Sequence, residues 1–209
     1  MIPVIVLAAG KSTRMGRSKA TLRLNAADTF LTRIIRTFQE AQVDDVVVVL
    51  GHEAEGILKS VDQSGLSPRF VVNKQYESGQ LSSVLAGLRA IDRPGVNAML
   101  MTLVDVPLVS AATVRAVLER YRTTHAPVVR PVRGALHGHP VLIDRSLFDE
   151  IRAADPRRGA KPIIRAHVSA SGDVEVEDDG AFSDIDTPED YTRVVELGTK
   201  PGDDARGKA

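Results

Sequence analysis

The feature that most constrains the fold of this chain is Val46–Leu50, a run of four valines and a leucine. Valine favours strands, and a strand without polar positions must be buried on both faces. Such strands belong to sheets that carry helices on either side. The run therefore predicts an α/β protein.

Further apolar runs are typical of strands, and amphipathic patterns lie between them. The strand candidates are Val4–Leu7, Arg69–Val72, Ala98–Leu103 and Val128–Val132. Apolar residues recur at i, i+3, i+4 and i+7 within 31–38, 81–88 and 114–121, which indicates helices. This alternation predicts a mainly parallel sheet flanked by helices on both faces.

The regular alternation of strand and helix patterns ends after Val132. We expect helices near 146–151 and 161–166 and short strands at 140–143, 174–176 and 182–185. Thr187 and Pro188 have the residue types of an N-cap and a first helical position. We therefore expect one domain over 1–197, and a flexible tail over 198–209, where apolar periodicity ends.

Composition excludes several classes of function. Lys+Arg and Asp+Glu number 27 each, and this balance argues against a nucleic-acid-binding protein. The absence of cysteine excludes disulfides and thiolate metal sites. The apolar run that ends at Ala9 is too short for a signal peptide or a membrane span. We expect a cytoplasmic protein that does not engage a membrane.

The first predicted strand leads into a loop with Gly10 and Gly16 and the cationic residues Lys11, Arg14, Arg17 and Lys19. Glycine allows close backbone approach to a ligand, and consecutive N–H groups form an anion-binding concavity. With fixed cations added, a polyphosphate is the expected ligand. The loop is not a P-loop, because Ile5 stands where that motif needs glycine.

Asp105 follows another predicted strand, so it falls at the same carboxyl edge of the sheet as this loop. Mg²⁺ is usually held by one or two carboxylates together with substrate phosphates. Asp105 is thus a candidate metal ligand, although a turn aspartate before the helix at Ser110 would look similar. Asp186 is the natural second ligand, but Asp184 lies on the same face of an extended segment.

Residues 7–19 resemble the opening motif of nucleotidyltransferases, L-A-A-G-x-S-x-R-M-G-x-x-K. The chain is most similar to the molybdenum cofactor cytidylyltransferases and their MobA-like relatives. Segments resembling four more family motifs follow in family order at 79–84, 103–109, 137–141 and 184–190. The resemblance implies a single-domain, Rossmann-like (GT-A-like) fold.

The resemblance also implies roles for individual residues. Arg14 and Lys19 would grip a triphosphate and, with Asp105, form the catalytic set, while Asp105 and Asp186 would hold Mg²⁺ or Mn²⁺. The family's equivalent aspartate precedes Thr-Pro, which favours Asp186 over Asp184. The nucleoside would contact Leu7, Ala8, Ala9, Gly10, Asn73, Gly79, Ser82 and Ser83.

On the acceptor side, the resemblance implies that His139 and Arg130 approach the second substrate. Zinc binding by His137 and His139 is not expected, because no third ligand is in view. The implied reaction transfers CMP from CTP to a phosphate of molybdopterin, releases pyrophosphate, and supplies a molybdenum hydroxylase. CTP is favoured because guanylyl relatives usually carry glycine at the position of Ala9.

Two alternatives remain open at this stage. One is a guanylyltransferase acting on molybdopterin or a phospholactate-type acceptor. The other is a nucleotide-binding chaperone for a molybdoenzyme that lacks turnover. Arg157 stands where the family's acceptor-side turn usually has an acid, so the sequence does not identify the acceptor. The sequence does not determine the oligomeric state either.

Overall fold

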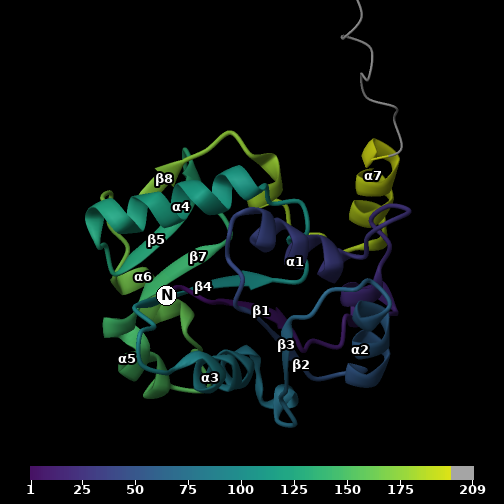
Figure 1. Ribbon diagram of the computed structural model, residues 1–209, viewed down its shortest axis with the longest axis horizontal. Helices are drawn as coiled ribbons and strands as arrows, with labels where there is room; N and C mark the ends of the chain where they lie inside the picture. The colour runs from purple at the N-terminus through teal and green to yellow at the C-terminus, as the bar shows by residue number, and fades with distance from the viewer. Residues whose placement is uncertain (199–209) are drawn as a thin grey trace, which may run out of the picture.

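A computed structural model describes residues 1–198, so most of the predicted tail lies outside the described residues. Within them, one mixed sheet has eight strands in the order β3-β2-β1-β4-β7-β5-β6, with β8 beside β5. Helices cover both faces (Figure 1). The strands are β1 (Val4–Ala8), β2 (Val46–Leu50), β3 (Arg69–Val72), β4 (Ala98–Leu103), β5 (Val128–Arg133), β6 (Leu136–His137), β7 (Val141–Asp144) and β8 (Asp173–Glu175).

The predicted parallel order describes the first half of the sheet. Strands β3, β2, β1 and β4 are parallel neighbours. In the second half, β7 lies between β4 and β5 and is antiparallel to both. The connection from β5 to β7, which contains only the short strand β6, is too short for a parallel crossover, so the chain must reverse.

Alternate residues of β1 face opposite layers of helices. Val4 and Val6 pack toward α1 (Phe30–Glu40), α2 (Ala54–Asp62) and α4 (Ala111–Thr124). Ile5 packs toward α3 (Gln80–Ile91), α5 (Phe148–Arg152) and α6 (Lys161–Ala166). All five residues of β2 are buried, which confirms the covered strand expected from the valine run.

The short elements differ more from expectation. Helix α2 and strand β6 were not predicted, and the strand expected at 182–185 is wrong. Residues Asp179–Phe182 form a 3-10 turn, after which the Ile185 N–H donates to the Asp105 carbonyl over 2.9 Å. Helix α7 (Pro188–Gly198) begins as predicted, with Thr187 Oγ1 accepting from the Asp190 N–H at 3.2 Å.

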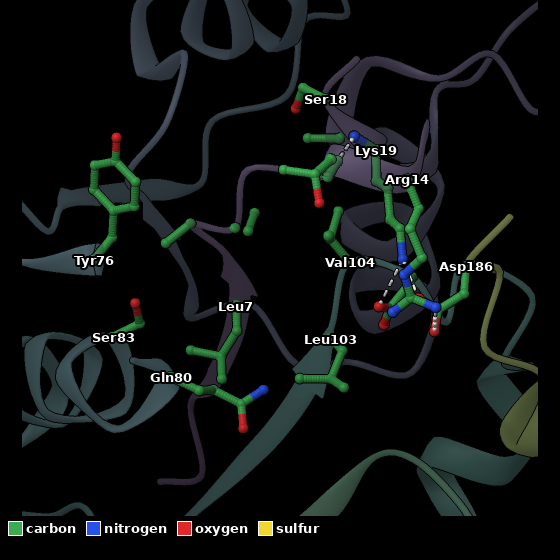
Figure 2. Close-up of a pocket in the computed structure, with 17 residues that line it drawn as sticks. Leu7, Arg14, Ser18, Lys19, Tyr76, Gln80, Ser83, Leu103, Val104 and Asp186 are labelled. Carbon is green, nitrogen blue, oxygen red and sulfur yellow. Dashed lines mark hydrogen bonds and ion pairs between the residues drawn. The ribbon is translucent and has the colours of Figure 1, made fainter. Parts of the chain in front are cut away.

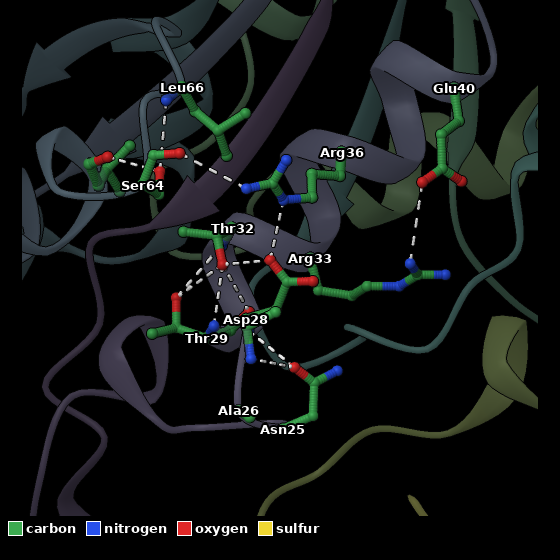
Figure 3. A network of polar contacts seen from close by, with 12 residues as sticks. Asn25, Ala26, Asp28, Thr29, Thr32, Arg33, Arg36, Glu40, Ser64 and Leu66 are labelled. Atoms are coloured by element: carbon green, nitrogen blue, oxygen red, sulfur yellow. Dashed lines mark hydrogen bonds and ion pairs between the residues drawn. The ribbon is translucent and has the colours of Figure 1, made fainter.

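A polar network fixes the start of α1 behind the first loop (Figure 3). The buried Asp28 Oδ1 accepts from Thr32 Oγ1 and from Arg36 Nε, each over 3.0 Å. Thr29 and Thr32 form a capping box, which satisfies N–H groups that the first helical turn leaves unpaired. The loop between β1 and α1 is therefore anchored at its far end.

In the part of the chain that the structure describes, no helix has the length and apolar character needed to cross a membrane.

Candidate active site

A cavity of about 340 Å³ opens at the carboxyl ends of β1 and β4. This is the edge at which ligands of parallel α/β sheets bind. Figure 2 shows its lining, which comes from the end of β1 and the loop after it, the segment from Tyr76 to the start of α3, the end of β4 with the residues after it, and Asp186 before α7. The lining residues are Leu7, Ala8, Ala9, Gly10, Ser12, Thr13, Arg14, Ser18, Lys19, Ala20, Tyr76, Gln80, Ser83, Leu103, Val104, Asp105 and Asp186.

Nine of these residues are ones that the sequence analysis named as site candidates. The remaining candidates for the nucleoside pocket lie outside the lining. Asn73 is buried and donates from Nδ2 to Ser82 Oγ (2.8 Å) and Ser83 Oγ (3.0 Å). Gly79 begins α3 with a φ of 110°. Asn73 and Gly79 therefore position the serines and the helix start rather than line the cavity.

Lys19 joins the two aspartates at the charged end of the cavity. Its Nζ lies 3.1 Å from Asp105 Oδ2 and 2.5 Å from Asp186 Oδ1. Arg14 adds a contact of 3.2 Å to Asp186 Oδ2. The hydrogen bond from Lys19 is the main cause that lowers the pKa of Asp186, so this carboxylate is ionised at neutral pH. Lys19 and Arg14 thus balance the charges of Asp105 and Asp186.

The donor set at this end suits a hard divalent cation. Asp105 Oδ1 is buried and has no hydrogen-bond partner among the described residues. A buried oxygen without a partner is unfavourable unless a ligand or water satisfies it. The described residues contain no group of three metal-ligating side chains. Two carboxylates therefore fit a cation such as Mg²⁺, which takes its other ligands from phosphates and water.

Asp184 and His139 lie close to Asp105. Burial, followed by the charge of Asp105, raises the pKa of Asp184. Burial also lowers the pKa of His139, whose Nδ1 lies 3.4 Å from the Met101 carbonyl. The neutral imidazole is thus favoured beside the carboxylates.

The arginine expected on the acceptor side lies outside the cavity. Arg130 contacts Asp173 between β5 and β8, with Nε and Oδ1 separated by 2.9 Å. The neighbouring Arg133 pairs with Asp179 at 2.6 Å and covers the ring of Phe182. Arg130 therefore joins two strands of the sheet, whereas Arg133 holds β5 to the segment before α7.

Sequence reasoning missed the aromatic wall of the cavity, which is formed by Tyr76. Its ring packs against Gly51, where a Cβ atom would lie 2.6 Å from Tyr76 Cγ and 2.7 Å from the Ala9 carbonyl oxygen. The Tyr76 hydroxyl lies 3.4 Å from His52 Nδ1. A glycine directly after the buried run Val46–Leu50, at the same sheet edge as Gly10, was the available signal.

The two ends of the cavity differ in chemistry (Figure 2). Tyr76, Gln80 and Ser83 line one side, and Arg14, Lys19 and Asp186 line the other. A neutral aromatic and hydroxyl surface suits a nucleobase and ribose, whereas the ionic end suits phosphates and their metal ion. The polarity of the two ends therefore suits a nucleoside triphosphate.

This fold and this cavity define a nucleotidyltransferase-type protein. Residues 4–171 match the family model described as the MobA-like NTP transferase domain. The chain therefore belongs to the MobA-like NTP transferase family, which confirms the resemblance seen in the sequence.

Relatives carry different functional names. Nicotine blue oxidoreductase of Paenarthrobacter nicotinovorans is 29% identical over 91% of this chain and 95% of its own length. A probable molybdenum cofactor guanylyltransferase of Opitutus terrae is 33% identical over 62% of this chain and 60% of its own.

Solved structures share the whole fold. A nucleotidyl transferase from Methanothermobacter superposes with a TM-score of 0.77 and 26% identity, covering 96% of this chain and 99% of the other. Rv0371c of Mycobacterium tuberculosis, solved in complex with manganese, gives 0.70 and 25%, covering 93% and 97%. These comparisons confirm the GT-A-like fold class.

Proposed function

We propose that this protein transfers CMP from CTP to a phosphate of a molybdopterin-type acceptor and releases pyrophosphate. The observation that carries the proposal is Lys19, held between Asp105 and Asp186 at the charged end of the cavity. One cation and two carboxylates at the carboxyl ends of the strands are the groups that would bind a triphosphate together with its metal ion. The neutral end beside Tyr76 leaves room for a base.

In the proposed step, an acceptor phosphate oxygen attacks the α-phosphorus of CTP. A new P–O bond forms as the bond from the α-phosphorus to the bridging oxygen breaks, and pyrophosphate leaves with that electron pair. The acceptor phosphate is largely ionised at pH 7, so the protein need not supply a base. Catalysis then consists of positioning and electrostatic stabilisation.

The residues at the charged end divide these tasks. Arg14 offers a planar fork to the β- or γ-phosphate. Lys19, a point charge, moves from the aspartates to the α-phosphate, where charge redistributes. Asp105 and Asp186 would hold Mg²⁺ or Mn²⁺, which would supply charge neutralisation at the phosphate oxygens. Two observations support this assignment: Asp105 Oδ1 has no hydrogen-bond partner within residues 1–198, and Rv0371c was solved in complex with manganese.

The base end favours a pyrimidine. Ala9 and Tyr76 both line the cavity, and the methyl group of Ala9 leaves less room for a purine than glycine would. One methyl group discriminates by about 1–3 kcal/mol, so the preference for CTP over GTP is modest. The relative named as a guanylyltransferase keeps GTP transfer as the second candidate.

The acceptor enters beside His139, which lies close to Asp105 and Asp184. The similarity to a probable molybdenum cofactor guanylyltransferase supports a molybdopterin-type phosphate as the acceptor. The product would then be delivered to a molybdenum hydroxylase. Arg130 makes its contact away from the cavity, so an acceptor role for it requires release from Asp173.

Two measurements test the proposal. In a thermal-shift panel with Mg²⁺, we expect CTP to stabilise the protein more than the other three nucleoside triphosphates, because ligands that bind the native state raise its stability. Pyrophosphate should then appear only when CTP and the molybdopterin acceptor are both present. NADPH serves as a comparison, because one relative is named an oxidoreductase. Stabilisation by NADPH alone, without pyrophosphate release from any triphosphate, would refute the proposal.

A further inference from the structure

The two aspartates proposed as metal ligands belong to segments that are far apart in the sequence. Asp105 belongs to the loop between β4 and α4, and Asp186 lies just before α7. Neither residue is part of a strand, so the sheet ladder does not fix their spacing. Their relative position depends on how residues 178–186 lie against residues 104–113.

Asp178 fastens residues 178–186 to the start of α4. Its Oδ2 accepts from the Ser110 N–H at 2.8 Å and from Thr113 Oγ1 at 2.6 Å, and its Oδ1 accepts from the Gly180 N–H at 3.1 Å. Burial raises the pKa of Asp178, but these hydrogen bonds outweigh burial and lower it. The carboxylate also lies at the amino end of a 14-residue helix, where the helix dipole stabilises a negative charge.

Close backbone contacts continue from Asp178 to the metal carboxylates. A Cβ atom at Gly180 would lie 2.1 Å from the Leu108 carbonyl oxygen, so the backbones touch there. Further along, the Ile185 N–H donates to the carbonyl of Asp105 itself at 2.9 Å. The segment is thus held against the Asp105 loop from Asp178 to the residue before Asp186.

We propose that Asp178 is a positioning residue for the metal site. By fastening residues 178–186 to the start of α4, it holds Asp186 at the distance from Asp105 that a divalent cation requires. Asp178 is not among the residues that line the cavity, so the role proposed for it is indirect. This inference rests on the proposed function. Outer partners of metal ligands typically change metal affinity or activity by about 10–100-fold when mutated.

The test compares Asp178→Asn with a matched control, Asp144→Asn. Asp144 is also a carboxylate that accepts from a hydroxyl, Tyr121 Oη at 2.5 Å, and from a backbone N–H, that of Ser146 at 2.8 Å. It pairs with Ala98 at the opposite end of β4 from Asp105. Mn²⁺ binding is measured by calorimetry at saturating CTP, Mg²⁺ dependence by pyrophosphate release, and folding by thermal unfolding.

For Asp178→Asn we expect Mn²⁺ affinity to fall about 10–100-fold, with turnover recovering as Mg²⁺ is raised. CTP binding without metal should stay unchanged, and Asp144→Asn should lose stability without losing metal affinity. If Asp178→Asn does not fold, Thr113→Val is the second variant. It removes the 2.6 Å hydrogen bond to Asp178 and the 3.2 Å bond from Ser110 Oγ, but it keeps the bond from the Ser110 N–H to Asp178, so it should produce a smaller loss of affinity in the same direction.

The outcomes separate the inference from the function. If the wild-type protein binds Mn²⁺ with CTP and both the Asp178 and Thr113 variants bind it equally well, the inference fails and the proposed function stands. A loss of turnover that Mg²⁺ does not restore, matched by Asp144→Asn, also refutes the positioning role. If the wild-type protein binds no Mn²⁺ with or without CTP, the proposed function fails together with the inference.

Discussion

Replacing Lys19 by methionine should tighten the binding of a divalent cation and at the same time slow turnover. In the structure without ligands, the Lys19 ammonium bonds to the carboxylates that would bind the metal, Asp105 and Asp186. A cation that enters alone must displace the ammonium. Methionine keeps the length of the side chain and removes this competitor, but it also removes the contact proposed for the α-phosphate.

The expected gain in metal affinity follows from how exposed each aspartate is in its ion pair with Lys19. The Asp105 side chain is 21% exposed, so its hydrogen bond counts at about 1.5 kcal/mol, the low end for bonds to charged groups. Asp186 is 36% exposed, and an exposed ion pair contributes roughly 0.5 kcal/mol. The sum of about 2 kcal/mol corresponds to metal binding about 30-fold tighter in the absence of nucleotide. Loss of a donor to a developing charge lowers kcat by about 100–1000-fold.

Calorimetric titration with Mn²⁺ in the absence of CTP measures the first effect, and pyrophosphate release measures the second. Lys11→Met is the matched control, because Lys11 is a cation of the same loop that pairs with Glu77 at 2.5 Å instead. It should leave Mn²⁺ affinity unchanged. Weaker or equal Mn²⁺ binding by Lys19→Met would show that Lys19 does not compete with the metal, and the reasoning would be wrong.

Three further substitutions test other parts of the site. Asp105→Asn should lower turnover by about 100–1000-fold while thermal unfolding shows an intact fold, because the proposed metal ion would stabilise the transition state by several kcal/mol. Near wild-type pyrophosphate release would contradict this. Ala9→Gly should reduce the preference for CTP over GTP, measured by titration of both nucleotides with Mg²⁺, and tighter GTP binding by the wild-type protein would indicate the guanylyl branch. Gly51→Ala should raise KM for CTP and lower stability by about 1–3 kcal/mol, because the new methyl group would displace the ring of Tyr76; unchanged KM and melting temperature would exclude Tyr76 from the base wall.

Local pattern was enough to determine the covered sheet and its main elements. The continuous valines of β2 have no polar face, and the strand is buried on both sides as that requires. The amphipathic stripe of α1, from Leu31 to Phe38, packs in the core. The glycines and cations after β1 predict a polyphosphate loop from residue type alone, since conformational freedom and charge are properties of the residues themselves, and this stays a prediction.

Only the tertiary structure decided what depends on long-range contact. The antiparallel insertion of β7 between β4 and β5 leaves no periodic signal, because a buried strand has the same apolar pattern in either direction. Tyr76 enters the cavity wall through the close approach of Gly51 and Ala9, from three separate segments. Lys19, Asp105 and Asp186 also come from three separate segments. The sequence predicted all three as site residues, but it did not show that Lys19 forms ion pairs with both aspartates. Residue type determines what a side chain can do, whereas packing determines which partner it finds.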